Sequence, residues 1–354
     1  MHNKLWIADN AVAVAGGRNL GDQYFEALPE HNFADLDLLI AGPVVGELSD
    51  SFDAYWNSAW ATPAEAFLPA TPDAAALTRF EATLEERIAA FRDTPYAKAA
   101  RESTLAGHAR AGQFPLTFAP AQAYADRPRA TDAPGTRETT GLVQSKLRPL
   151  IEAARSEVAL ISPYFVPSDR GVEMLGQLVA RGVRVRVLTN SLASTDVPAV
   201  HTGYARRREQ LLARGVEIHE FRPQTGAGDD AAHGERHRDA RGSLHAKAVV
   251  IDRAQIVVGS MNLDPRSRAL NTEVAVFVQS TALGARLGVL FDEAVAPQRA
   301  FSVTLAEPGV AGSALVWTSV EDGRSVRYTQ EPLAGFWRRF SSSVLGLFVD
   351  DDML

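Results

Sequence analysis

His2-Asn-Lys-Leu-Trp-Ile-Ala-Asp9 near the start of the chain and His245-Ala-Lys-Ala-Val-Val-Ile-Asp252 in its second half share one pattern. In both copies a glycine follows the aspartate by seven residues and an asparagine follows that glycine by three. These residues are Gly16 and Asn19 in the first copy, and Gly259 and Asn262 in the second. A lone His-x-Lys is most often an ordinary surface feature, but five matching positions in two copies are not. We therefore interpret the pair as an internal repeat that can place two histidines face to face.

The residues that follow each histidine predict a β-hairpin. Residues 5–15 are almost wholly apolar apart from Asp9-Asn10, and residues 244–259 are interrupted mainly at Asp252-Arg253. Apolar runs broken by such polar pairs are typical of two strands joined by a tight turn. Side chains two positions apart on a strand point to the same face, so each histidine should share a face with its lysine. The aspartates fall at the turns, and we interpret them as structural.

The rest of the sequence alternates between apolar runs and amphipathic segments. We predict helices at 44–59, 141–155, 171–180 and 200–214, one or two helices within 72–102, and strands at 33–38, 117–124, 158–162, 183–188, 216–221 and 273–278. Residues 125–140 and 223–242 are polar and contain glycine, as loops do. This alternation predicts an α/β fold with layers around a central sheet.

Strands and helices precede His245 in the second half, but only one residue precedes His2. We therefore expect residues 1–112 to form a first half that lacks its opening strands. Residues 113–354 are expected to form a complete second half with an amphipathic tail at about 334–349.

The composition excludes several classes of protein. The chain has 354 residues, 46% of them hydrophobic, which is enough for two globular domains. Its net charge of -7, from 36 basic and 43 acidic side chains, disfavours a dedicated nucleic-acid binder. It has no cysteine, which excludes disulfides and thiolate metal sites. No apolar run is long enough to span a bilayer.

The paired residues suit phosphodiester chemistry. A neutral histidine can attack phosphorus to form a phosphohistidine, while a protonated histidine opposite gives its proton to the departing alkoxide. Lysines and asparagine amides stabilise the charge on the phosphoryl oxygens. A carboxylate behind each imidazole would fix its tautomer. Asp35 and Glu273 are candidates for that position, each on the strand that follows its own motif. These side chains supply the charge stabilisation, so the chemistry requires no metal or other cofactor.

At these motifs the chain resembles the phospholipase D superfamily and, within it, the C-type branch of bacterial cardiolipin synthases. Further stretches carry the resemblance over nearly the whole chain, among them Gly16-Gly-Arg-Asn-Leu-Gly-Asp-Gln-Tyr-Phe25, Leu188-Thr-Asn-Ser-Leu-Ala-Ser-Thr-Asp196, His201-Thr-Gly-Tyr-Ala205 and Gly259-Ser-Met-Asn-Leu-Asp-Pro-Arg-Ser267. The resemblance implies two α-β-α sandwich halves related by pseudo-twofold symmetry.

The resemblance also implies residue roles. A phosphatidyl group would pass through a histidine to a lipid hydroxyl, with His2 as nucleophile and His245 as general acid and base. The residues implied to bind phosphate are Lys4, Lys247, Asn19 and Asn262. The implied substrates are phospholipids, with phosphatidylglycerol or phosphatidylethanolamine as donor, at the surface of a bacterial cell membrane. Whether an accessory protein takes part stays open.

Two alternatives remain at this point. Water in place of the lipid hydroxyl would make the protein a phospholipase D-type hydrolase or another phosphodiesterase. Members of the family have a substantial region before the first motif, including strands of the same sheet. The sequence is therefore expected to be truncated, and an inactive, membrane-associated fragment is the other alternative.

Four further features have less specific signals. The tail at 335–348 would place aromatic and aliphatic side chains on one helix face, which suits a membrane interface and a docked helix equally well. Arg206-Arg207-Arg208 favours a solvated helix face. His233 and His237 have a metal-ligand spacing but lack clear further ligands. Tyr164, at a strand end, is a candidate to line the pocket.

Overall fold

The computed structural model describes residues 1–28, 31–67, 73–128, 141–223, 241–307 and 314–348. By packing, the chain forms two compact units, one of residues 1–55 and 119–354 and one of residues 56–118. Repeat symmetry and packing are different criteria, so the expected division into halves at residue 112 stays a prediction. Most of the two predicted loops, together with His233 and His237, lies outside the described residues.

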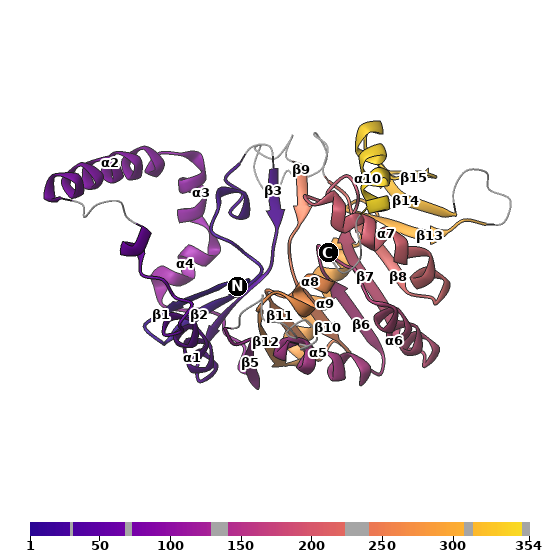
Figure 1. Ribbon diagram of the computed structural model, residues 1–354, viewed down its shortest axis with the longest axis horizontal. Helices are drawn as coiled ribbons and strands as arrows, with labels where there is room; N and C mark the ends of the chain where they lie inside the picture. Colours follow the sequence, from indigo (N-terminus) through magenta and orange to yellow (C-terminus); the bar gives the residue numbers. More distant parts are fainter. Residues whose placement is uncertain (29–30, 68–72, 129–140, 224–240, 308–313, 349–354) are drawn as a thin grey trace. The chain divides into compact units, whose positions relative to one another are not determined.

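A ten-stranded sheet forms the centre of the first unit (Figure 1). Its order is β15 (Arg324–Tyr328), β14 (Leu315–Glu321), β13 (Ala300–Leu305), β8 (Glu217–Phe221), β7 (Arg184–Asn190), β6 (Glu157–Ile161), β10 (Ala248–Ile251), β11 (Gln255–Gly259), β12 (Val274–Gln279) and β5 (Ala121–Ala125). β6, β7 and β8 run parallel, and the other neighbours pair antiparallel. The predicted α/β fold is confirmed.

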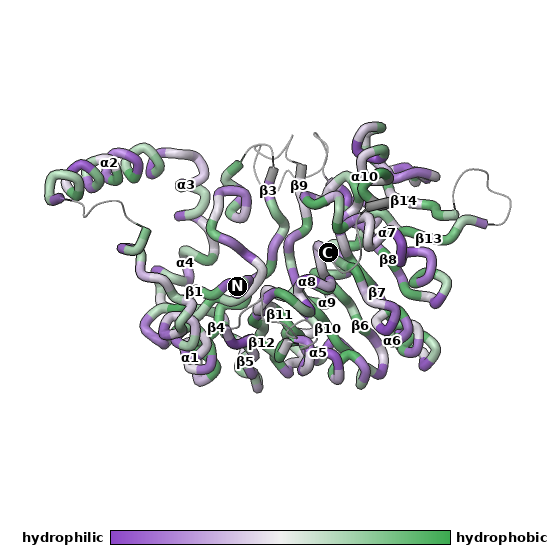
Figure 2. Tube along the Cα trace, in the orientation of Figure 1, coloured by the Kyte–Doolittle hydropathy of each residue, from purple (hydrophilic) through white to green (hydrophobic). Residues whose placement is uncertain are grey.

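Helices cover this sheet on both faces. α5 (Leu142–Glu152), α6 (Asp169–Ala180) and α7 (Pro198–Ala213) pack on one face, and α9 (Thr281–Ala294) packs on the other. A buried hydrophobic cluster lies on each face of the sheet: the first core beneath α5, α6 and α7, and the second core beneath α9. In β6, Val158 and Leu160 belong to the first core, whereas Ala159 and Ile161 belong to the second core. A strand buried on both faces is mostly apolar, and β6 and β10 are accordingly coloured mainly green in Figure 2.

The first repeat forms a smaller antiparallel sheet in the order β1 (Leu5–Ala8), β2 (Val12–Gly16) and β4 (Asp37–Ala41). It matches β10, β11 and β12 of the second repeat in order and direction. Both hairpins turn through two residues with positive φ, 52° and 53° at Asp9 and Asn10, and 51° and 49° at Asp252 and Arg253. Two consecutive left-handed residues give the tight turn whose twist suits a hairpin.

The second core joins the two repeats. Ala13 and Ala15 of β2 and Leu48 of α1 (Val44–Trp56) lie in the same buried cluster as Val250 of β10 and Val276 of β12. Within the first unit, the two hairpins therefore pack on each other through their apolar faces. This packing fixes the histidine that opens one hairpin relative to the histidine that opens the other.

Two sequence-based strand boundaries were wrong. Residues 33–38 were expected to form one strand, but β3 (His31–Ala34) ends before Asp35 and β4 begins at Asp37. Asp35 and Asp37 therefore do not share a strand face. β3 instead pairs in parallel with β9 (Arg241–Leu244), a strand from the other repeat.

The second boundary concerns the second motif, which was expected to lie on one strand from residue 244 to 251. The structure has β9 up to Leu244, an irregular segment, and then β10 from Ala248. The backbone N–H groups of His245 and Ala246 both donate to the carbonyl oxygen of Ala34, at 2.8 and 3.0 Å. This shared acceptor bends the chain at the histidine.

The second unit is helical. It contains α2 (Ala74–Arg92), α3 (Pro95–Glu102) and α4 (Thr104–Ala111), and a 3-10 turn, η2 (Ala64–Phe67). The side chains of Asp73, Thr94 and Ser103 cap these three helices by accepting from backbone N–H groups. One or two helices within 72–102 were predicted from the sequence; the structure has α2 and α3 there, and the capping residues explain where each begins.

The remaining elements of the first unit are η1 (Asp22–Tyr24), α8 (Pro265–Ala269) and α10 (Phe336–Phe348). α10 packs against α7. Within the described ranges, no helix combines the length and the hydropathy that crossing a bilayer requires.

Candidate active site

Each repeat histidine contacts a carboxylate that comes from the other repeat. Nδ1 of His2 lies 2.8 Å from Oε2 of Glu273, and Nδ1 of His245 lies 2.8 Å from Oδ2 of Asp35. Sequence analysis expected a carboxylate behind each imidazole, but it did not predict this exchange. The exchange follows from the packing of the repeats, because β3 runs beside β9 and the backbone N–H of His2 donates to the carbonyl oxygen of Thr272 at 3.0 Å.

The position of the carboxylates determines which ring nitrogen can react. An ionised carboxylate only accepts hydrogen bonds, so Nδ1 of each ring carries the hydrogen. Nε2 then has the free lone pair, which is the arrangement of a nucleophilic or basic imidazole. The two histidine–carboxylate contacts therefore hold both rings in the same tautomer.

Glu273 lies directly before β12 and is fully buried. Its Oε2 accepts a hydrogen bond from Oγ of Ser260 at 2.5 Å, and its backbone N–H donates to Oδ2 of Asp126 at 2.9 Å. These bonds fix the carboxylate before any substrate arrives. Sequence analysis did not single out Ser260 or Asp126 individually, although Ser260 follows the motif glycine directly.

Aromatic rings enclose His245. The ring of Tyr24 meets it edge-on at 5.0 Å between centroids, and that of Phe33 lies 5.1 Å away. Burial lowers the pKa of His245, while its hydrogen bond to Asp35 acts in the opposite direction and the charge of Lys247 adds to the lowering. Because the ordinary pKa of histidine is about 6.5, this lowered pKa leaves the ring of His245 neutral at pH 7.

The two motif lysines are unusually easy to deprotonate. Burial lowers the pKa of Lys247 to about 7 and that of Lys4 to about 8. Each Nζ donates to the carbonyl oxygen of its own histidine, at 2.6 Å for Lys247 and 2.7 Å for Lys4. Nζ of Lys247 also lies 3.3 Å from Nε2 of His245. The Lys247 ammonium thus stands beside the imidazole of His245, and the Lys4 ammonium is bound to the backbone of His2. A phosphate bound near them would stabilise their protonated form.

The two motif asparagines are placed differently. Nδ2 of Asn19 donates to the hydroxyl of Tyr24 at 2.7 Å. The backbone N–H of Asn262 donates to Oγ of Ser267 at 3.2 Å, and its buried Oδ1 has no hydrogen-bond partner among the described residues. Within the described part of the chain, no side chain therefore binds the amide oxygen of Asn262.

Two glycines allow the close approach on which the site depends. A Cβ on Gly17 would lie 2.4 Å from Oδ1 of Asp35, the carboxylate that supports His245. A Cβ on Gly259 would lie 2.2 Å from the carbonyl oxygen of Val274. A side chain at either position would displace the backbone or the carboxylate.

The larger of two cavities in the first unit does not border the motif residues. A cavity of about 510 Å³ is lined by residues of β5, α5, β11 and β12, and no motif histidine, lysine or asparagine borders it. A space of about 20 Å³ lies beside Lys247 and Gly259. The chemistry of the paired motifs, and not cavity size, therefore marks the candidate site.

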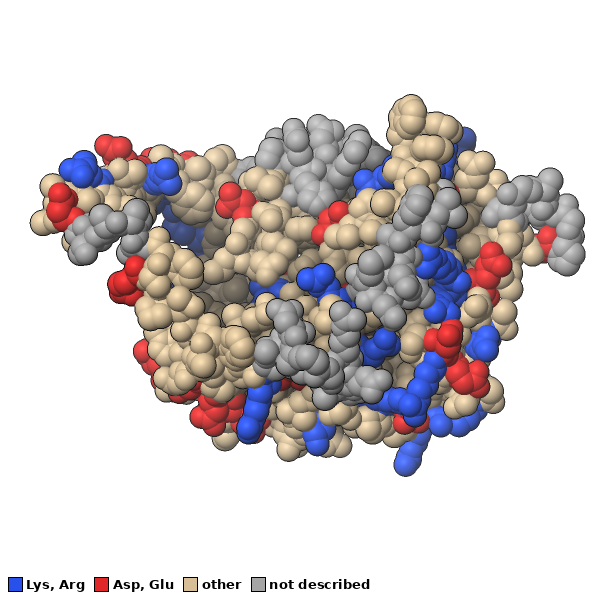
Figure 3. All heavy atoms as spheres, in the orientation of Figure 1, with Lys and Arg blue, Asp and Glu red and all other residues tan. Residues whose placement is uncertain are grey.

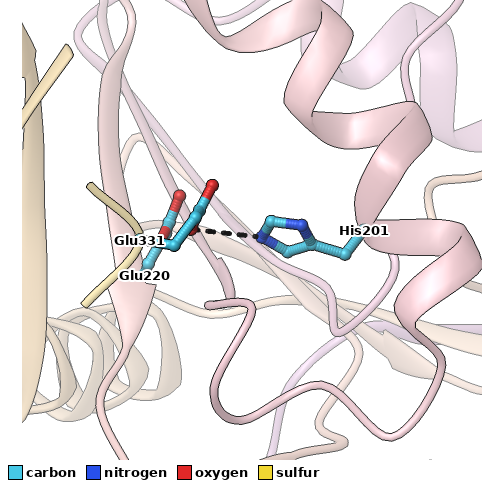
Figure 4. Close-up of side chains that lie close together, drawn as sticks. All are labelled: His201, Glu220 and Glu331. Atoms are coloured by element: carbon cyan, nitrogen blue, oxygen red, sulfur yellow. Dashed lines mark ion pairs between the residues drawn. The ribbon is translucent and has the colours of Figure 1, made fainter. Parts of the chain in front are cut away.

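A second cluster of titratable groups joins α7, β8 and the segment before α10 (Figure 4). Nε2 of His201 lies 3.9 Å from Oε2 of Glu331, and Glu220 lies beside them. Burial lowers the pKa of His201 to about 4, so its ring is neutral at pH 7. One histidine and two carboxylates could in principle hold a cation.

The neighbours of this cluster argue against a cation site. The guanidinium of Arg208 donates to Oε1 of Glu220 at 2.8 Å and also binds Glu331. The other oxygen of Glu220 accepts from Nε1 of Trp317 at 2.9 Å. Because Arg208 already binds both carboxylates, the cluster fits a buried ion-pair network better than a metal site.

Comparison with known proteins identifies the family of the chain. Residues 147–295 match the family model described as "Cardiolipin synthase, PLD-like domain". The chain is 32% identical to Cardiolipin synthase C of Escherichia coli over 96% of its own length and 70% of that protein. The chain belongs to the phospholipase D-like cardiolipin synthase family. The family is one of phosphatidyltransferases, and the expected resemblance is confirmed.

Two further proteins are similar to this chain. A protein of uncharacterised function from Helicobacter pylori is 29% identical over 96% of the chain and 64% of its own length. The crystal structure of phosphatidylserine synthase from Haemophilus influenzae matches with a TM-score of 0.52 at 15% identity, over 85% of this chain and 63% of that one. At that identity the match shows a common fold.

Proposed function

We propose that the protein transfers a phosphatidyl group from one phospholipid to the hydroxyl of another, forming cardiolipin. The observation that carries the proposal is the pair of exchanged contacts, His2 with Glu273 and His245 with Asp35. Two imidazoles with the same tautomer, each two residues from a motif lysine, match the needs of a two-step displacement at phosphorus. The family relatives named as cardiolipin synthases support the same substrate class.

In the first step, Nε2 of His2 attacks the phosphorus of the donor lipid. The N–P bond forms while the bond from phosphorus to the headgroup oxygen breaks, and His245 gives its Nε2 proton to the leaving alkoxide. The ligand-free His245 is neutral, so it must gain a proton on substrate binding. The negative charge of the bound phosphodiester favours that protonation.

In the second step, the now neutral His245 takes the proton from the acceptor hydroxyl. The new oxygen–phosphorus bond forms as the N–P bond to His2 breaks, and both histidines return to their starting states. Lys4 and Lys247 stabilise the charge on the equatorial oxygens in both steps, and Asn19 and Asn262 donate hydrogen bonds to them.

The proposed donors are phosphatidylglycerol and phosphatidylethanolamine, which the protein would meet at a membrane surface. α10 supports such peripheral association. Its exposed side chains include Phe336, Trp337 and Phe340, whose rings pack on one another 5.5 to 6.2 Å apart. Figure 3 shows the outer part of this helix without charged atoms. Exposed aromatic clusters of this kind are typical of membrane-interface helices.

An assay with vesicles of radiolabelled phosphatidylglycerol tests the proposal. The wild-type chain should produce cardiolipin and free glycerol, and His245→Ala and His2→Ala should each abolish turnover. His108→Ala, a histidine of α4 in the other unit, should leave it unchanged. Phosphatidic acid as the sole product would identify a hydrolase. Undiminished synthesis by His245→Ala, or no product from the wild-type chain, would contradict the proposal.

A further inference from the structure

We propose that Asp196 and Tyr164 form a subsite that binds the hydroxyl groups of the acceptor alcohol. The subsite rests on the proposed function, because it concerns the second substrate of the same reaction. It would take a polyol headgroup such as glycerol and would favour that acceptor over water. The two residues leave the carboxyl ends of neighbouring parallel strands, β6 and β7, where ligands of open α/β sheets commonly bind.

Tyr164 is held beside the motif segment that contains Asn262. Oγ of Ser162 donates to the carbonyl oxygen of Tyr164 at 2.8 Å and accepts from the backbone N–H of Leu263 at 3.1 Å. Phe165 and Leu263 form a parallel bridge. Leu263, the residue after the motif asparagine, is thus tied directly to Ser162 and Phe165, which lie on either side of Tyr164 in the chain.

Asp196 is held relative to His245 by a separate set of bonds. The side chain of Asn190, the last residue of β7, accepts from the backbone N–H of Leu244 and donates to its carbonyl oxygen, both at 2.9 Å. Leu244 directly precedes His245. At the other end of the loop, Arg338 of α10 binds the carbonyl oxygen of Thr195. The loop that carries Asp196 therefore has a fixed position beside the motif.

The two side chains contact each other at this position. The hydroxyl of Tyr164 donates to Oδ2 of Asp196 at 2.8 Å. The negative charge of Asp196 acts on the pKa values of His245 and Lys247, which it raises against the larger effect of burial. It also acts on Tyr24, the residue that binds Asn19. The carboxylate therefore lies within electrostatic reach of the reacting groups and is itself exposed.

A carboxylate at this place suits a hydroxyl better than a phosphate. It repels an anion but accepts hydrogen bonds, and it retains lone pairs beyond the one that Tyr164 uses. One hydroxyl of a glycerol group can donate to Asp196 while another attacks phosphorus and passes its proton to Nε2 of His245. The new oxygen–phosphorus bond then replaces the N–P bond to His2. Water has a single oxygen and cannot occupy both positions.

The experiment measures how the phosphatidyl group partitions between glycerol and water. Vesicles of phosphatidylglycerol are incubated with radiolabelled glycerol, and the labelled lipid is compared with the phosphatidic acid released. Asp196→Asn should lower the ratio of transfer to hydrolysis about tenfold, through a higher KM for glycerol, since a hydrogen bond to a charged group is lost. Tyr164→Phe should shift the ratio in the same direction by less.

Two controls make the outcome specific. Asp169→Asn changes an exposed carboxylate of α6 that pairs with Arg207, and it should leave the ratio unchanged. With 1-propanol as acceptor, which has one hydroxyl, Asp196→Asn should have no effect on the ratio. An unchanged glycerol ratio in Asp196→Asn overturns the subsite while leaving the proposed function intact. A wild-type protein that consumes no donor overturns the proposed function and the subsite with it.

Discussion

At the scale of single residues, the exchange of carboxylates between the repeats makes the two histidines separately testable. Asp35 supports the proposed acid and base, His245, and Glu273 supports the proposed nucleophile, His2. Each carboxylate acts on a histidine about two hundred or more residues away in sequence, at separations of 210 and 271 positions. A substitution in one repeat should therefore impair the histidine of the other.

Asp35→Asn and Glu273→Gln should each lower kcat by about 10²- to 10⁴-fold, because the amide does not hold the reactive tautomer. The two defects should differ in their dependence on the leaving group. A p-nitrophenyl phosphodiester needs no acid, so the defect of Asp35→Asn should shrink with that substrate, while the defect of Glu273→Gln should persist. Stopped-flow absorbance measures both. If instead the defect of Glu273→Gln shrank with this substrate and that of Asp35→Asn persisted, the contacts would not determine which histidine is the nucleophile and which is the acid.

The motif lysines predict a pH dependence of anion binding. Burial lowers their pKa values to about 7 and 8, so above these values the free site loses positive charge. A phosphodiester binds the protonated lysines, and its affinity should therefore fall about tenfold or more between pH 7 and pH 9. Glycerophosphoglycerol is a suitable ligand because its charge is constant over this range.

Calorimetry in buffers of different ionisation enthalpy measures the protons taken up on binding. Lys247→Met should reduce that uptake and flatten the pH dependence. Lys146→Met, which changes an exposed lysine of α5, should keep the proton uptake and the pH dependence of wild type. Equal proton uptake by Lys247→Met and wild type would show that Lys247 does not titrate in the site.

At the scale of elements, the two hairpin turns have the same backbone conformation but differ in the hydrogen bonds that their aspartate side chains make. The carboxylate of Asp252 accepts from the backbone N–H groups of Arg155, Ser156 and Glu157 at 2.7 to 3.1 Å. These bonds join the β10–β11 turn to the start of β6. In the described part of the chain, the side chain of Asp9 makes no such hydrogen bond. The turn conformation is repeated, whereas this anchor is not.

Asp252→Ala should lower the free energy of unfolding by about 2 kcal/mol, since it leaves backbone donors without their charged acceptor. Asp9→Ala is the matched variant and should change it by less than about 0.5 kcal/mol. Backbone hydrogen bonds hold the pKa of Asp252 below its usual value. Its contribution is therefore complete at neutral pH and is lost as the pH falls through that lowered value. Urea unfolding at pH 7 measures the difference; equal effects of the two variants would contradict the asymmetry.

The elements that could be predicted from sequence are those with local signals. The hairpins follow from apolar runs broken by Asp9-Asn10 and Asp252-Arg253, and α6 and α7 follow from their periodicity. Pairing between distant segments has no such signal, which is why the division of 33–38 and the β3–β9 pairing could not be foreseen. The strand β13 was also not predicted, although Phe301 and Val303 alternate with polar residues.

The same limit applies to the candidate site. The repeat pattern identified His2, His245 and their lysines, because identical spacing is visible in the chain itself. Asp35 and Glu273 could be nominated as carboxylates near the motifs, but their exchange depends on how the repeats pack. Asp196 gave no spacing signal, and only the fold brings it within electrostatic reach of His245.

At the scale of the whole molecule, α10 both docks on the protein and exposes aromatic side chains, although sequence analysis had weighed a docked helix and a membrane interface as alternatives. Arg338 donates to the carbonyl oxygen of Leu192 at 2.6 Å, and Ser342 is buried, so the polar face of the helix docks on the protein. The apolar side chains of Phe336, Trp337 and Phe340 are 53 to 75% exposed. A surface helix normally buries its apolar face, so the inverted orientation points to an apolar environment outside the protein.

Changing Trp337 and Phe340 together to serine should weaken binding to phosphatidylglycerol vesicles about tenfold or more, because the aromatic area is no longer removed from water. Leu305→Ser, on β13, removes an apolar side chain that is 44% exposed and should leave vesicle binding unchanged. Cosedimentation with vesicles gives the affinities. Equal binding by the double variant and wild type would assign membrane contact to another surface.

The central claim is that a phosphatidyl group passes through His2. Mass spectrometry of the chain after acid-free quenching of a reaction with phosphatidylglycerol tests this most directly. We predict a phosphatidyl adduct on His2 in the wild-type chain, its persistence in Asp196→Asn and its loss in His2→Ala. An adduct on His245, or cardiolipin synthesis by His2→Ala at the wild-type rate, would contradict the account.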